Sequence, residues 1–492
     1  MAKVVLAIFK EFEITVAKLG YFVLNNAYNN NTTIDTLAAE MGFEALERRL
    51  ACGPHTWNLV GQMIIFGKDR ESYDNAPSEA TNEALEMEKW RGAGPIGVLL
   101  DIINYIKTPQ QYALFEQYQR LAHSELPAES RKVKEPVKPV ITRWNSYYKC
   151  FKRAAELQLA VNGYANYHIQ RIETADAYAR SRNNKLPDAP DWMRTAGLTA
   201  HDWQVLNEYI DVLEPLKQAT KRLEGRGNNS GFGAVAEIIP VFEYLLTAYE
   251  DRLQQYESVI HDEHDESPED HLAINLRAAL LKLNKYYNKL DLSPAYYAAT
   301  ILHPRYNHYL DAAWAERPDW LESSNRNFQS LWAKYKSLPK PRTKPIFKPN
   351  DIEDAIDSFI DPSGVTDNEE DEYESWKRSE PVAAKGSDSA NKPIKYWVSL
   401  EYRYPNLSKL TIDMLSIPGS SCECERLFSE LGDLLEPRRC NISPQLLAAI
   451  QCDRRWIRAG FGGGEVAMKD LIESLTDDEM DAKFGVHTWE SG

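Results

Sequence analysis

Residues 416–429 read SIPGSSCECERLFS, which is the most informative stretch of the sequence. It sets Cys422 and Cys424 around an acid, and it places Glu425 directly before Arg426. Taken alone, Glu425 is a helix-surface or capping acid beside an arginine. The two cysteines form a C-x-C pair, whereas zinc sites are usually built from C-x-x-C pairs, which the sequence lacks. The meaning of the stretch therefore depends on the motifs that precede it.

Several such motifs precede residues 416–429 in a fixed order. They are NNAYNNN at 25–31, CGPHTWNL at 52–59, TRWNS at 142–146, the tryptophan- and leucine-spaced run 203–225, YYAATILHP at 296–304 and the segment 393–418 that opens with PIKYW. Together with residues 416–429, hereafter the C-terminal motif, this series resembles the hAT superfamily of DNA transposases, most closely its fungal type. Many short motifs in one order are more specific than any one of them.

The resemblance carries an expectation about catalysis. In that family the Glu before the Arg of the C-terminal motif is the last acid of a metal-binding Asp-Asp-Glu triad, and this position is Glu425 here. The second triad Asp falls on Asn25, and the first would lie upstream of Met1. The resemblance thus implies a chain truncated at its N-terminus, without the family's zinc finger and first three strands.

Asn25 is a poor substitute for a metal-binding aspartate. Two-metal phosphoryl transfer needs anionic oxygens that hold two divalent ions a few ångströms apart, and Mg²⁺ prefers carboxylates. Asn25 offers a neutral oxygen, and Glu425 alone is no two-metal cage. We therefore expect no cofactor and no metal site. Mg²⁺ or Mn²⁺ would be needed only if the chain is an active metal-dependent DNA transposase or strand-transferase, which is the alternative function.

Composition sets the broad class. A chain of 492 residues exceeds one core, so several domains are expected. A net charge of −16 argues against a general nucleic-acid coat but leaves a local basic face open. Six cysteines without a regular framework fit a reducing compartment, and the absence of a long apolar run or a signal pattern predicts no membrane partner. The family resemblance implies a nuclear protein.

The expected fold is mostly α, with an incomplete RNase H-like α/β core remnant, a large helical insertion and a C-terminal helical dimerisation segment. Strands are predicted at 20–24 and 48–52, and helices at 34–41 and 55–66. The predicted domains are a partial RNase H-like core at 1–70, a helical connection with a basic linker at 71–139, the helical insertion at 140–345, an acidic disordered linker at 346–392, the dimerisation region at 393–460 and an acidic tail at 461–492.

Arg143 and Trp144 are the candidate DNA-binding residues. By resemblance, this Trp stacks on bases at the transposon end, where one stacked base is worth about 1–3 kcal/mol, and the Arg contacts phosphate. The alternative is a core Trp that begins the helical insertion, because Tyr147 and Phe151 follow it at helical spacing. The sequence leaves both interpretations open.

Cys52 and His55 could supply half of a zinc site through their C-x-x-H spacing. A second pair at suitable spacing is missing from the sequence. We therefore interpret them as a buried structural pair.

The region 393–460 holds more apolar residues than so short a segment buries by itself. It is predicted to pack on the rest of the chain or on a partner, which is a second copy or a related hAT transposase. The candidate dimerisation residues are Trp397, Leu415, Leu427, Phe428, Leu446, Leu447 and Ile450. The leading hypothesis is a transposase-derived protein that acts through dimerisation, is catalytically inactive and retains residual DNA binding.

Overall fold

The computed structural model describes residues 1–25, 28–67, 94–122, 124, 132–140, 143–223, 234–256, 271–339 and 371–421, with short pieces between 424 and 454. The chain divides into two compact units. The first comprises Met1–Gly225 and Phe232–Ser420, and the second Arg226–Gly231 and Ser421–Gly492. The architecture and the candidate site described below belong to the first unit.

The first unit begins with a small α/β part. Its elements are α1 (Ala2–Glu11), the 3-10 turn η1 (Val16–Lys18), β1 (Phe22–Leu24), α2 (Tyr28–Met41), α3 (Ala45–Arg48), β2 (Arg49–Ala51) and α4 (Gly53–Phe66). The two strands form a parallel pair with Phe22 opposite Arg49 and Leu24 opposite Ala51. A parallel pair requires a crossover connection, which here contains α2 and α3. Both predicted strands are confirmed.

Helix α2 begins earlier than the predicted start at residue 34, because the Asn- and Thr-rich run joins the helix. The Thr33 hydroxyl donates to the backbone oxygen of Asn29 at 2.8 Å, and Thr36 repeats the pattern on Thr32 at 2.8 Å. Threonine hydroxyls that bond one turn back are satisfied inside a helix. A polar run that reads as a turn can therefore extend α2.

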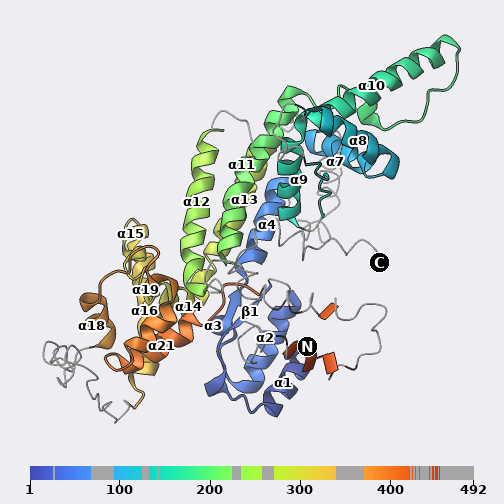
Figure 1. Cartoon of the computed structure of the whole chain (residues 1–492). Helices are drawn as coiled ribbons and strands as arrows, with labels where there is room; N and C mark the ends of the chain where they lie inside the picture. Colours follow the sequence, from blue (N-terminus) through green and yellow to red (C-terminus); the bar gives the residue numbers. More distant parts are fainter. Residues whose placement is uncertain are drawn as a thin grey trace, which may run out of the picture. The chain divides into compact units, whose positions relative to one another are not determined.

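The rest of the first unit is helical, as expected from the sequence (Figure 1). Its α-helices up to residue 336 are α7 (Pro95–Ile106), α8 (Pro109–Ala122), α9 (Trp144–Glu156), α10 (Gln158–Ser181), α11 (Ala200–Leu223), α12 (Ile238–Gln254), α13 (His271–Tyr287), α14 (Pro294–Ile301), α15 (Tyr309–Ala313) and α16 (Pro318–Lys336). Short 3-10 turns η3 (Asp191–Arg194), η4 (Val235–Glu237) and η6 (Leu290–Leu292) join them. No helix among the described residues is long and apolar enough to cross a membrane.

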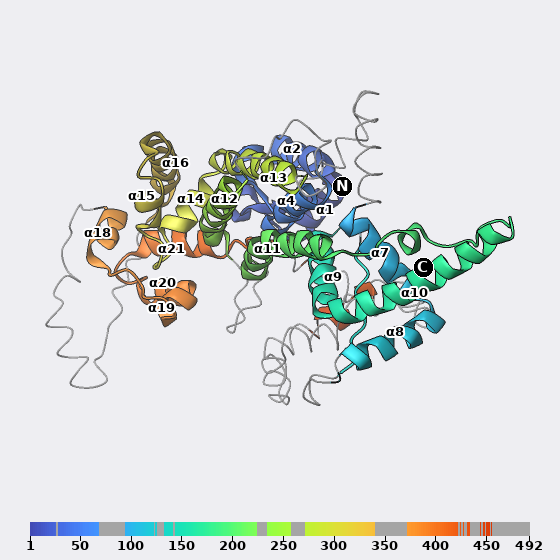
Figure 2. The ribbon, with the colours of Figure 1, turned by 90° about the horizontal axis from the view of Figure 1, so that it is seen from above.

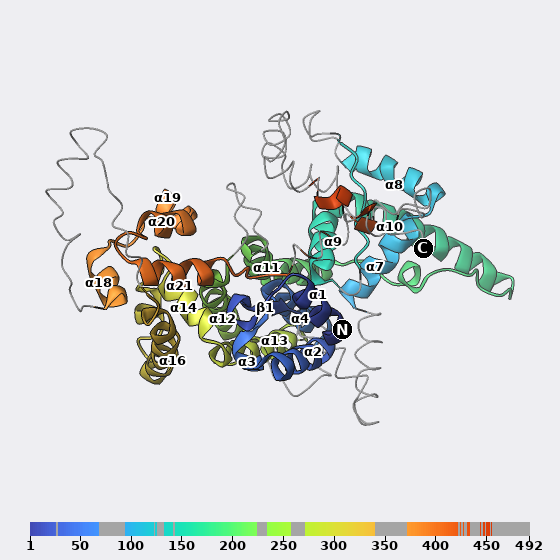
Figure 3. The same ribbon diagram turned by 90° about the horizontal axis from the view of Figure 1, so that it is seen from below.

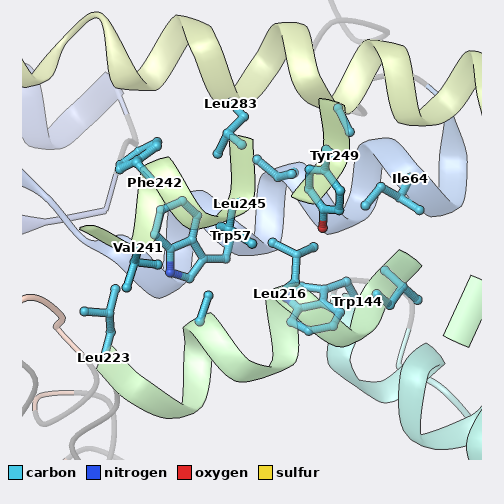
Figure 4. Close-up of a cluster of buried hydrophobic side chains, with 14 of the residues drawn as sticks. Trp57, Ile64, Trp144, Leu216, Leu223, Val241, Phe242, Leu245, Tyr249 and Leu283 are labelled. Carbon is cyan, nitrogen blue, oxygen red and sulfur yellow. The ribbon is translucent and has the colours of Figure 1, made fainter. Parts of the chain in front are cut away.

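Helix α4 is the centre of the core. Its residues Trp57, Val60 and Ile64 are fully buried, because α11, α12 and α13 all pack against this part of the molecule. The Trp57 ring meets Phe242 of α12 edge-on, with 4.6 Å between centroids. Figure 4 shows the surrounding side chains, including Leu216 of α11. The predicted helix at 55–66 is thus present as α4, and it is buried because it is apolar on most faces.

A second helical layer closes the first unit. Helices α18 (Glu372–Ser379), α19 (Asp388–Asn391), α20 (Pro393–Ser399) and α21 (Pro405–Leu415) follow one another, and α21 packs against α14 and α16 (Figures 2 and 3). The prediction of a disordered acidic linker is wrong for 371–392, while residues 346–370 lie outside the described part.

The acidic segment 371–392 folds because two of its acids bond to helix N-termini. Asp371 caps α18 by accepting from the backbone N–H groups of Tyr373 and Glu374. A Glu372 carboxylate oxygen accepts from the backbone N–H groups of Asn406 and Leu407, at 3.0 and 2.9 Å, at the start of α21. Carboxylates satisfy the unpaired N–H groups of a first helical turn. An acidic composition therefore does not prevent this segment from folding.

Candidate functional site

The candidate site lies at the carboxyl ends of β1 and β2. The Leu24 carbonyl accepts from the Cys52 N–H at 2.9 Å, and Asn25 follows directly and is half-buried. The Asn30 amide donates to the backbone oxygen of Asn25 at 3.0 Å, which ties the turn after β1 to α2. In α/β folds ligands bind beyond the carboxyl ends of parallel strands. Asn25 thus occupies a position where a functional side chain is expected.

The first residues of the C-terminal motif reach the same edge. The Gly53 N–H donates to the Gly419 carbonyl at 3.0 Å. Pro418 bridges Ala234 in antiparallel fashion, and the Val235 N–H donates to the Ile417 carbonyl at 3.0 Å. Residues 417–419 of the motif are therefore fixed at the same edge as the turn that carries Asn25. Glu425 itself lies outside the described residues.

Gly53 is where this approach is closest. A Cβ built at this position would lie 2.6 Å from Leu223 Cδ1 and 3.3 Å from the Gly419 carbonyl oxygen. Any larger residue would require the Leu223 side chain to shift and would crowd the Gly419 carbonyl. The glycine of the CGPHTWNL motif thus has a packing role, which its sequence alone did not reveal.

The described residues at this edge do not fit a two-metal centre. Asn25 contributes a neutral amide, and the buried Cys52 heads α4 with its carbonyl accepting from the Thr56 hydroxyl at 3.2 Å. No group of three or more His, Cys, Asp or Glu among the described residues could hold a metal ion. Cys52 is buried, whereas His55 is only half-buried, so the predicted buried pair is met at Cys52 alone.

Trp144 is a core residue. It is 2% exposed, its backbone N–H donates to the Asn58 side-chain oxygen at 3.3 Å, and its ring lies against Gly61 of α4. Figure 4 places it within the buried cluster. Its ring has no face open to a nucleic-acid base, so the geometry supports the core interpretation and not stacking. Arg143, the N-cap residue of α9, is exposed and remains accessible.

Two of the predicted dimerisation residues are also internal. Trp397 is fully buried, its indole N–H donates to the Leu302 carbonyl at 2.9 Å, and its ring centroid lies 4.8 Å from that of Trp376. Leu415 is 4% exposed. Both belong to the core of the first unit, because α20 and α21 pack on its other helices, so they offer no surface to a second subunit.

The other predicted dimerisation residues belong to the second unit. Leu446 is 53% exposed there, and Leu427, Leu447 and Ile450 are half-buried. Phe428 lies outside the described residues. These four described positions remain candidates for a subunit contact.

An exposed apolar face that we did not predict lies on α20 and the turn that follows it; we call it the α20 face. Ile394, Val398 and Tyr402 are 38%, 53% and 67% exposed and follow one another at four-residue spacing. This spacing places Ile394 and Val398 on one side of α20, and Tyr402 lies in the turn after the helix. The same helix buries Trp397, so α20 has one apolar side in the core and another in solvent. The four-residue spacing was the available sequence signal.

Comparison with known proteins gives this C-terminal region a family. Residues 371–457 match the model of the hAT family C-terminal dimerisation region. The match begins at Asp371, the cap of α18, and not at the predicted boundary of 393. The packed helices α18 to α21 therefore belong to one family module together with the C-terminal motif.

Three curated proteins are similar over longer stretches. The "Zinc finger BED domain-containing protein DAYSLEEPER" of Arabidopsis thaliana is 21% identical over 68% of this chain and 42% of its own length. The "Putative AC transposase" of Zea mays is 21% identical over 66% and 37%, and the "Putative transcriptional regulator tpeD" of Talaromyces stipitatus 20% over 93% and 48%. The chain spans less than half the length of each relative. With the motif order and the matched dimerisation region, the chain is a hAT superfamily transposase-like protein.

Proposed function

We propose that this hAT-derived protein works by dimerisation and does not cut DNA. The observation that carries the proposal is the exposed apolar face of Ile394, Val398 and Tyr402, which lies within the matched dimerisation region. The partner is a second copy of the chain or a related hAT transposase. The relatives' names, a transposase and a transcriptional regulator, support action in the nucleus.

The α20 face suits a subunit contact for a physical reason. Removing apolar surface from water stabilises by about 25 cal/mol per Å², and three neighbouring apolar side chains lose this contribution while they face solvent. In a two-fold dimer the same patch meets itself. Trp397 fixes α20 on the core from the other side, so the face is held rigid before it meets a partner.

Catalytic inactivity rests on Asn25. We interpret β1, α2 and β2 as a remnant of an RNase H-like core, in which the turn after β1 would carry a triad carboxylate. The amide at this position cannot supply the negative charge that two divalent ions require. Glu425 would then have no carboxylate partner at position 25.

Residual DNA binding would use Arg143 and the lysines that precede it. Lys132 and Lys138 are exposed, like Arg143, in the stretch leading into α9. Exposed cations can contact phosphates without reading sequence. This contribution is expected to be weak and salt-sensitive in a chain with a net charge of −16.

Dimerisation is tested by placing lysine at two positions of the α20 face. The wild type is expected to elute at twice the 56.3 kDa monomer mass in light scattering on a sizing column. Val398→Lys with Tyr402→Lys is expected to elute as a monomer, because like charges would be buried against each other. That juxtaposition costs several kcal/mol, and about 3 kcal/mol corresponds to a drop of about 100-fold in affinity.

The matched control is Leu159→Lys, an exposed leucine on α10 outside the dimerisation region, at 71% exposure. It should leave the dimer intact. A wild type that is monomeric alone but pairs with a related transposase would locate the function in the heteromer. A dimer that survives both α20 lysines would contradict the proposed surface.

Catalytic inactivity is tested by incubating the protein with Mn²⁺ and a DNA that carries the terminal repeats of a hAT transposon. The wild type and Glu425→Gln are expected to give equal, background levels of nicked product, because Asn25 cannot complete the metal site. Gel electrophoresis of end-labelled DNA provides the measurement. A product that requires Glu425 would establish the strand-transferase alternative.

A further inference from the structure

A hollow in the first unit lies between the end of β2, the first turn of α4 and the C-terminal end of α13. Its lining includes Arg49 and Ala51 from β2, Gly53 from α4, and Tyr286 and Lys289 at the end of α13. Arg49 and Ala51 lie on one face of β2 because strand side chains alternate, while Leu50 between them is buried. The strand thus directs a guanidinium toward this hollow.

The lining contains cations and no carboxylate. Arg49 and Lys289 are its charged members, and the remaining lining residues are apolar or neutral. Lys282 and Lys285 lie on α13 one to two turns before Lys289. A local group of four cations stands out in a chain whose net charge is −16.

Three of these four cations have no carboxylate partner within the described part of the chain. No ion pair there joins Arg49, Lys285 or Lys289 to an acid. The Lys289 ammonium lies instead 5.2 Å from the Tyr286 ring centroid, and Lys282 lies 5.7 Å from the same centroid. A cation over a tyrosine ring gains only about 0.5–1 kcal/mol at an exposed site.

The cations also repel one another. Partial burial, followed by the charges of Lys285, Arg49 and Lys282, lowers the pKa of Lys289 below its usual value. Like charges held close together destabilise the fold slightly. An anion bound among them would remove that cost.

From this arrangement we propose that the hollow binds a phosphate group, held by Arg49 and Lys289 and flanked by Lys282 and Lys285. A guanidinium matches two phosphate oxygens with its fork of N–H donors, and an ammonium adds a point charge. Several converging cations suit a phosphate better than a single carboxylate. The phosphate comes from a nucleic-acid backbone or from a free nucleotide. The site belongs to a single chain, so it does not depend on dimerisation.

The test uses the full chain and two probes, a fluorescently labelled DNA duplex and unlabelled ATP. Duplex affinity is measured by fluorescence anisotropy over a salt series, and ATP binding by calorimetry. The double variant Lys285→Glu with Lys289→Glu is expected to lower the affinity for the probe that binds the wild type by at least about tenfold. For the duplex, the slope of log affinity against log salt should fall by about 0.9 for each phosphate that the protein no longer neutralises.

The control is Lys3→Glu with Lys10→Glu on α1, two exposed lysines away from the hollow that change the net charge equally. A decrease of duplex binding restricted to the α13 pair assigns the site to nucleic acid. A decrease of ATP binding restricted to that pair assigns it to a free nucleotide. If melting curves show that the two glutamates unfold the protein, Lys285→Gln with Lys289→Gln is used in place of Lys285→Glu with Lys289→Glu.

The proposal is overturned if neither probe binds the wild type at low salt, or if the α13 pair and the α1 pair behave alike. Light scattering on the same variants separates this outcome from a failure of dimerisation. A variant that no longer binds the phosphate probe but keeps the wild-type mass shows that the two properties are independent.

Discussion

Trp397→Ala is expected to lower the free energy of unfolding by about 3–5 kcal/mol, the usual range for a buried tryptophan truncated to alanine. The side chain is fully buried, so its removal leaves a cavity between α20 and the core. It also removes the indole N–H that donates to the Leu302 carbonyl at 2.9 Å. The measurement is chemical denaturation followed by circular dichroism.

The neighbouring residue provides the control. Val398→Ala, on the exposed side of the same helix, should change the free energy of unfolding by less than about 0.5 kcal/mol. In a dimerisation assay under conditions where Trp397→Ala is still folded, we expect Val398→Ala to weaken the dimer more than Trp397→Ala does. If Trp397→Ala kept full stability and only dissociated the dimer, Trp397 would be an interface residue and the packing described for α20 would be wrong.

This pair shows what the sequence could predict about the C-terminal region. Its excess of apolar residues correctly indicated packing on the rest of the chain or on a partner. Periodicity alone could not tell which side of α20 faces the chain's own core, because Trp397 and Val398 are both apolar and adjacent. That choice depends on the Leu302 carbonyl at the end of α14 and the Trp376 ring of α18, which come from other parts of the sequence.

The boundary of the same region was missed for a different reason. Acidic composition predicted disorder through residue 392, but Asp371 and Glu372 bond to helix N-termini. Composition counts charges and does not see their partners. Tyr373 and Trp376, both buried, were the signal within the segment that it could fold.

The two strands that border the candidate site were predicted from local sequence patterns. A short β-branched and aromatic run predicted β1, whereas Asn25 was singled out only by the resemblance to the hAT family. The hydrogen bond between Gly53 and Gly419 joins residues separated by most of the chain, and no local pattern specifies it. The fold thus adds a fact that the sequence pattern lacks, which is that residues 417–419 of the C-terminal motif lie beside the start of α4.

Trp144→Ala is also expected to destabilise the chain by about 3–5 kcal/mol, because its ring is buried between α9 and α4. A DNA-stacking Trp would behave differently. Its removal would leave the stability unchanged and weaken DNA affinity by about 1–3 kcal/mol. Denaturation and fluorescence anisotropy on the same variant separate the two roles. Arg143→Ala, an exposed neighbour, should affect only DNA affinity.

Gly61 makes the prediction sharper. A Cβ at this position would lie 2.4 Å from Trp144 Cγ and 2.7 Å from Trp144 Cβ, and neither atom is the flexible end of a side chain. Gly61→Ala in the wild type should therefore cost about 1–3 kcal/mol through overpacking, even though alanine favours a helix by up to about 1 kcal/mol.

In the Trp144→Ala background the ring atoms are gone but the Cβ contact at 2.7 Å stays, so the cost of Gly61→Ala should fall without disappearing. The double-mutant cycle then gives a coupling of opposite sign to the single cost, as expected for residues in direct contact. Equal effects of Gly61→Ala in both backgrounds would mean that α4 and α9 do not meet through this ring. Trp144 would then be free of the core, and its assignment to DNA would regain its support.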